Sequence, residues 1–105
     1  GLGCCAGRVT GRVRVVKRGE EALDLDGEIL VAARTDPGWV FLFPAAAGLL
    51  VERGSPLSHS AIVARELGLP TIVNIPGLTE RLRTGDRVAM DGRSGEIWLQ
   101  EERAG

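Results

Sequence analysis

The chain has 105 residues, enough for one domain with its own core and no disulfide or metal staple. It is 44% hydrophobic and 26% charged, with a formal net charge of -1. These values are typical of a soluble globular domain and give no support for a nucleic-acid or acidic-membrane binder. No stretch approaches the roughly 18 apolar residues of a membrane span.

The start of the sequence bears on its origin. It begins at Gly1 without a methionine, and nothing near its start resembles a signal peptide. We therefore expect residues 1–105 to be a single domain excised from a larger cytoplasmic protein. Cys4 and Cys5 are neighbours outside any CxxC or Cys/His pattern, so no metal site is predicted.

The first predicted element is a half-buried strand over residues 8–15, where valines and arginines alternate. The arginine side is either a phosphate-binding stripe or a solvated face balanced by the acidic residues that follow. The second interpretation is favoured. The acidic residues are Glu20, Glu21, Asp24, Asp26 and Glu28.

Short apolar runs predict two buried strands, over residues 28–33 and 48–52. Between them, Thr35 or Asp36 can cap a helix that has Pro37 at its first position, which predicts a short helix or turn over 39–47.

The strongest helix signal follows Gly54, ends at Leu67 before Gly68, and predicts a main helix over about 57–67. Two registers remain open: Ser55 as N-cap with Pro56 at the first position, or Ser58 as N-cap.

The last third of the chain predicts a strand at 71–73, a helical turn within 76–83 and a hairpin of 87–91 with 96–100. Short strands mixed with one strong helix indicate an α/β domain.

His59 is the only histidine, and this pattern places it in or beside the first turn of the main helix. The N–H groups and the positive dipole end there favour an anion. A neutral imidazole is nucleophilic near neutral pH, so His59 is a candidate to accept a phosphoryl group.

The residues around His59 suit this chemistry. Gly54 and Ser55 are small enough for close approach, and Ser58 and Ser60 offer hydroxyl groups. Arg65 lies about 120° around the helix from His59 and is favoured as a structural residue over a phosphate clamp. From spacing alone, a structural or capping histidine is an equally good interpretation of His59.

Several motifs, in order, resemble the phosphohistidine swivelling domain of phosphoenolpyruvate-utilising enzymes. That family includes phosphoenolpyruvate synthase, pyruvate phosphate dikinase, rifampicin phosphotransferase and Enzyme I. The motifs are residues 11–15, 27–32, 35–39, 47–50, 57–70, 85–88 and 91–95. The forms Thr35-Asp36-Pro37-Gly38-Trp39 and Leu57-Ser58-His59 look more like the synthase and rifampicin phosphotransferase branch.

The resemblance implies a β/β/α swivelling fold and a C-terminal place in a larger enzyme. It implies that His59 takes a phosphoryl group from ATP at an ATP-grasp domain and swings to an acceptor domain. ATP and Mg²⁺ would bind the partner domain, and the acceptor would be pyruvate-like, rifampicin-like or another compound. The position of Asp36 lies close to the histidine in family structures.

The chain differs from the family at Gly54-Ser55, where family members usually have two glycines. Leu57 occupies the place of the regulatory threonine of pyruvate phosphate dikinase, so that regulation is not expected. Two alternatives remain: a non-catalytic scaffold module with the same fold, and an Enzyme I-like carrier phosphorylated by phosphoenolpyruvate.

Overall fold

The computed structural model describes residues 2–16, 27–34, 37–54 and 58–100. It holds a seven-stranded sheet in the order β1-β5-β4-β3-β2-β6-β7. The strands are β1 (Leu2–Cys5), β2 (Arg8–Val15), β3 (Ile29–Ala32), β4 (Gly48–Val51), β5 (Thr71–Val73), β6 (Arg87–Asp91) and β7 (Glu96–Gln100). Three helical segments accompany them: the 3₁₀-helix η2 (Pro37–Ala45), α1 (His59–Leu67) and α2 (Leu78–Arg81).

The centre of the sheet is parallel, because β2, β3, β4 and β5 run in the same direction. β1, β6 and β7 pair antiparallel at the two sides. Every residue of β3 and β4 is buried, as expected of parallel strands covered on both faces. This coverage explains why both strands read as continuous apolar runs in the sequence.

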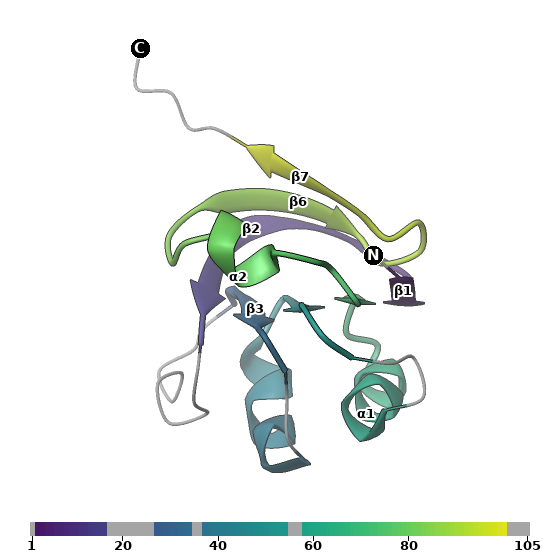
Figure 1. Cartoon of the computed structure of the whole chain (residues 1–105). Helices are drawn as coiled ribbons and strands as arrows, with labels where there is room; N and C mark the ends of the chain where they lie inside the picture. The colour runs from purple at the N-terminus through teal and green to yellow at the C-terminus, as the bar shows by residue number, and fades with distance from the viewer. Residues whose placement is uncertain (1, 17–26, 35–36, 55–57, 101–105) are drawn as a thin grey trace.

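The molecule has three layers. In Figure 1, β2, β6 and β7 curl over one face of the central strands, and α1 and η2 lie on the other face. The side chains of β3 alternate between two hydrophobic cores. Leu30 and Ala32 pack toward α1 and η2, whereas Ile29 and Val31 pack between the two sheet layers. This is an α/β fold with the β/β/α arrangement that the resemblance implied.

Most predicted elements are confirmed. The strand at 8–15, the strand at 71–73 and both hairpin strands have the predicted bounds, and α2 provides the expected helical turn. The two predicted buried strands are slightly shorter, and the helix expected over 39–47 is η2, which begins at Pro37. The main helix begins at His59 rather than at 57, because Ser58 caps it.

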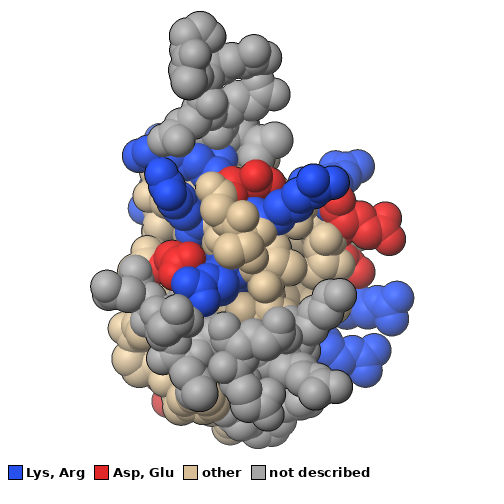
Figure 2. Space-filling model, turned by 90° about the vertical axis from the view of Figure 1, so that its left-hand side faces the viewer, with Lys and Arg blue, Asp and Glu red and all other residues tan. Residues whose placement is uncertain are grey.

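The charged side of β2 behaves largely as a balanced surface. Arg14 donates to Glu28 through Nε and Nη2, at 3.2 and 2.9 Å. Arg8 lies 3.5 Å from Asp91. The other predicted acidic partners lie within 17–26, outside the described residues. On the face in Figure 2, basic and acidic side chains are interspersed and do not form one basic field.

Within the described ranges, the structure contains no helix long and apolar enough to cross a membrane.

Candidate functional site

His59 is exposed and is the first residue of α1. The helix begins there because Ser58 has extended backbone angles and its Oγ accepts a hydrogen bond from the Ala61 N–H at 3.2 Å. Of the two registers, the structure therefore has Ser58 as N-cap. Gly68 ends the helix in the left-handed conformation, at φ 71°.

Two arginines that the sequence analysis did not single out lie near this helix start. Arg34 follows β3 and Arg53 follows β4, each two residues beyond the paired residues Ala32 and Val51. Parallel strands end at the same edge of a sheet, where α/β proteins commonly bind ligands. An arginine just past each of two predicted strands was the signal that could have found them.

A small cavity of about 60 Å³ joins these arginines to the start of α1. Among the predicted site residues, it includes Gly54, Ser58 and Ser60. Ser60 is buried, whereas His59, which lies between Ser58 and Ser60 in the sequence, is exposed and is not one of the lining residues. The cavity is lined by Arg34, Leu49, Val51, Arg53, Gly54, Ser58, Ser60, Ala61 and Val73.

Ser55 and Asp36, the other predicted site residues, lie outside the described residues, as does Leu57. Among described residues, no three His, Cys, Asp or Glu side chains gather to hold a metal ion. The part of the site that the structure describes is therefore one exposed imidazole next to a cavity lined by two arginines.

Arg65 has a structural contact, as favoured from the sequence. Its Nε donates to the carbonyl oxygen of Cys4 at 2.9 Å, which ties α1 to β1. Burial raises the pKa of the Cys4 thiol, and the nearby Arg65 guanidinium offsets part of that rise.

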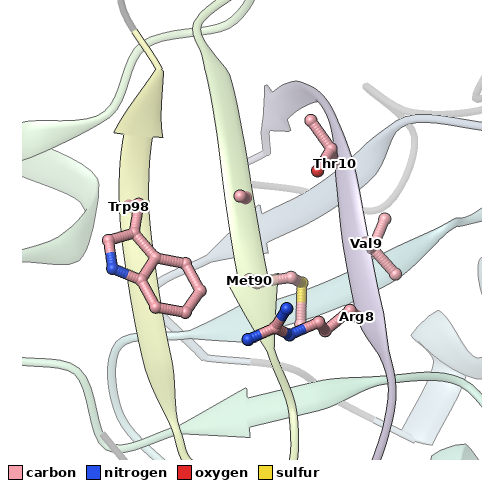
Figure 3. Close-up of a pocket in the computed structure, with 6 residues that line it drawn as sticks. Arg8, Val9, Thr10, Met90 and Trp98 are labelled. Atoms are coloured by element: carbon pink, nitrogen blue, oxygen red, sulfur yellow. The ribbon is translucent and has the colours of Figure 1, made fainter.

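A larger hollow of about 370 Å³ lies on β2, β6 and β7. Figure 3 shows Arg8 extending from β2 toward β6, with the Trp98 indole on β7. The described residues that line it include no histidine, cysteine or carboxylate. The lining residues are Arg8, Val9, Thr10, Ala89, Met90 and Trp98.

Known sequences similar to this chain are much longer proteins. It is 50% identical over 102 residues to an uncharacterised protein of Mycobacterium tuberculosis, covering 96% of this chain and 12% of that protein. It is 43% identical over 97 residues to the rifampicin phosphotransferase of Bacillus cereus, covering 92% and 11%. It is 44% identical over 107 residues to the prodigiosin-synthesizing transferase PigC of Serratia marcescens, covering 99% and 12%.

Solved structures agree on the fold. An Enzyme I protein solved by NMR matches with a TM-score of 0.64 at 25% identity, over 73% of this chain and 32% of that one. Aconitase X of Thermococcus kodakaraensis matches with a TM-score of 0.73 at 19% identity, over 96% of each chain, which shows a shared fold alone. The family model described as "PEP-utilising enzyme, mobile domain" matches residues 23–95, and the chain belongs to that family.

Proposed function

We propose that this chain is the phosphoryl-carrying domain of an ATP-dependent, dikinase-type phosphotransferase, and that His59 is the residue phosphorylated. The observation that carries the proposal is the position of His59. Its imidazole is exposed at the first residue of α1, beside a cavity lined by two arginines. An exposed nucleophile can enter the active site of another domain.

The chemistry requires little from this domain. The imidazole nitrogen forms a P–N bond, and the resulting phosphoramidate passes its phosphoryl group onward. A helix N-terminus contributes only about 0.3–1 kcal/mol to binding an anion at an exposed site. That is too little to drive transfer, so the donor and acceptor sites must provide positioning and metal charge.

We place those sites on other domains of a longer polypeptide, with this domain in its C-terminal part. The chain spans only 11–12% of the length of the relatives described above. ATP and Mg²⁺ would bind an ATP-grasp domain, and the acceptor a third domain. Two relatives named as a phosphotransferase and a transferase, at 43% and 44% identity, support this branch of the family.

The test uses the parent protein with radiolabelled ATP. We expect an acid-labile, base-stable adduct on His59 that is lost in His59→Gln. Glu66→Gln, on the same face of α1, is the matched control and keeps the adduct.

Two results would contradict this proposal. No adduct with a competent ATP-grasp partner would indicate the scaffold alternative. Labelling from phosphoenolpyruvate but not from ATP would indicate an Enzyme I-like carrier.

A further inference from the structure

Arg34 and Arg53 are held side by side by the backbone. β3 and β4 pair in parallel with Ala32 opposite Val51. Beyond the paired residues the chain bends, and the N–H groups of Glu52 and Arg53 donate to the carbonyl oxygens of Ala32 and Ala33, at 2.9 and 2.8 Å, which keeps the two segments adjacent. The two arginines therefore leave neighbouring strands at matching positions.

Both arginines border the cavity at the start of α1. Ala32 and Val51 pack in the core beneath that helix. Arg34 and Arg53 lie two positions further on, and both line the cavity beside Ser58. Arg34 also borders a second hollow with Thr79 and Glu80. Two arginines that follow separate strands thus lie at the N-terminal end of one helix.

No acidic side chain is among the described residues that line this cavity. The carboxylate of Glu52, adjacent in sequence to Arg53, does not line the cavity and accepts both hydrogen bonds of Thr79 from α2, which lower its pKa together with a smaller effect of the Arg53 charge. No ion pair or side-chain hydrogen bond to another described residue holds the guanidinium of Arg34 or Arg53. The two guanidinium groups, the positive helix end and the serine hydroxyls of the described lining residues favour an anion in this cavity.

The size of the cavity limits what it can hold. About 60 Å³ is far below the roughly 300 Å³ at which pockets for small organic ligands begin. The cavity therefore suits one small oxyanion and not a nucleotide. Guanidinium groups bind phosphate oxygens in pairs, which matches a tetrahedral dianion.

We propose that this cavity is a binding site for a single phosphate-like dianion, with Arg34 and Arg53 as positioning residues. Its role in phosphoryl transfer rests on the function proposed above: the site would hold the phosphoryl group beside His59 while the domain moves between partners. The binding itself requires no donor, no partner domain and no reaction at His59.

Gly54 provides a steric probe of the same cavity. A Cβ added there would lie 3.5 Å from Val51 Cγ1 and 3.5 Å from Val73 Cβ, which are ordinary contacts with two lining residues. Gly54→Ala should therefore fold normally and place a methyl group inside the cavity.

The experiment is a titration of the ¹⁵N-labelled 105-residue chain with inorganic phosphate, followed by its backbone amide resonances. Sodium chloride of equal ionic strength is the reference. We expect saturable shifts centred on Gly54, Ser60 and Ala61 that chloride does not reproduce. Arg34→Gln and Arg53→Gln should each weaken binding about tenfold, the loss expected for one charge-assisted contact.

Two further variants separate the cavity from general charge. Gly54→Ala should weaken phosphate binding while leaving the spectrum of a folded domain. Arg93→Gln removes an exposed arginine outside the cavity and should bind phosphate like the parent chain. The site would be overturned if the shifts did not saturate or if chloride reproduced them. It would also be overturned if Arg93→Gln reduced the shifts as much as Arg53→Gln does.

A chemical donor links the cavity to His59 without a partner domain. Phosphoramidate transfers its phosphoryl group to an imidazole nitrogen: its P–N bond breaks, ammonia leaves, and a P–N bond to His59 forms. If the cavity holds that group, hydrolysis of the adduct should be severalfold faster in Arg34→Gln and Arg53→Gln than in Arg93→Gln. Equal hydrolysis rates in the three variants would show that the cavity has no role in transfer. If the parent protein is not labelled by ATP but the chain still binds phosphate, only the proposed function is wrong.

Discussion

Glu52 accepts two hydrogen bonds from one residue, Thr79, through the same carboxylate oxygen. The backbone N–H and the hydroxyl of Thr79 lie 2.9 and 2.8 Å from Glu52 Oε1. The pair joins the end of β4 to the start of α2. Besides the hydrogen bonds from Thr79, the positive charge of the adjacent Arg53 also lowers the pKa of this carboxyl group, with a smaller effect.

The first prediction concerns acid stability. The hydrogen bonds from Thr79 lower the pKa of Glu52 below its usual value, against a smaller effect of desolvation. A carboxyl group whose folded-state pKa is depressed contributes stability above its unfolded pKa and loses it as pH falls through the folded pKa. Unfolding midpoints in urea should therefore fall between about pH 5 and pH 3, and less so in Glu52→Gln.

The matched comparison is Thr79→Val, which removes the hydroxyl and keeps the backbone donor. It should show part of the acid dependence of the parent chain. If Glu52→Gln has the same pH dependence as the parent between these limits, the pair with Thr79 contributes nothing measurable.

The second prediction concerns the start of α1. Ser58→Ala removes the hydroxyl that accepts from the Ala61 N–H, and should cost about 0.5–2 kcal/mol in the free energy of unfolding. Ser58→Asn keeps a capping oxygen and should remain close to the parent. Denaturant titrations of both variants provide the measurement. A Ser58→Asn variant as unstable as Ser58→Ala would show that the cap is not the cause.

The third prediction compares two phenylalanines of the 3₁₀-helix η2. Phe43 is 1% exposed in the core beneath the sheet, whereas Phe41 is 58% exposed. Phe43→Ala should lower the free energy of unfolding by about 3–5 kcal/mol because it leaves a cavity. Phe41→Ala should change it by only about 0.5 kcal/mol. Similar losses from both would contradict this account of η2 and its core.

The elements that the sequence predicted well share a local cause. The hairpin flanking residues 92–95, the alternating strand at 8–15 and the Gly68 stop are encoded by neighbouring residues. Neighbouring residues did not decide between Ser55 and Ser58 as the N-cap of α1, because either serine can cap a helix. The structure supplied the answer through the Ala61 hydrogen bond.

The features that sequence reasoning missed depend on distant contacts. β1 pairs with β5, and a Cβ on Gly3 would collide with the carbonyl oxygen of Gly92, so this strand requires a glycine against the hairpin turn. Nothing in residues 2–5 shows that approach. Arg34 and Arg53 become neighbours only once β3 and β4 pair in parallel, so the residues of the main helix alone do not reveal the two arginines that line the cavity beside Ser58.

The last prediction concerns Cys4, which packs against the core beneath the sheet while its carbonyl oxygen accepts from Arg65 Nε. Burial raises the pKa of the thiol, and Arg65 offsets part of this rise by its charge and a hydrogen bond. In a Cys5→Ser background, alkylation by iodoacetamide should therefore have its pH midpoint above that of an ordinary thiol, because only the thiolate reacts. Arg65→Met should raise the midpoint further and slow alkylation at a fixed pH near 8 severalfold. Arg65→Lys keeps the charge and should fall between the two. A midpoint at or below that of free cysteine would show that Cys4 is open to solvent and that β1 does not lie against the core.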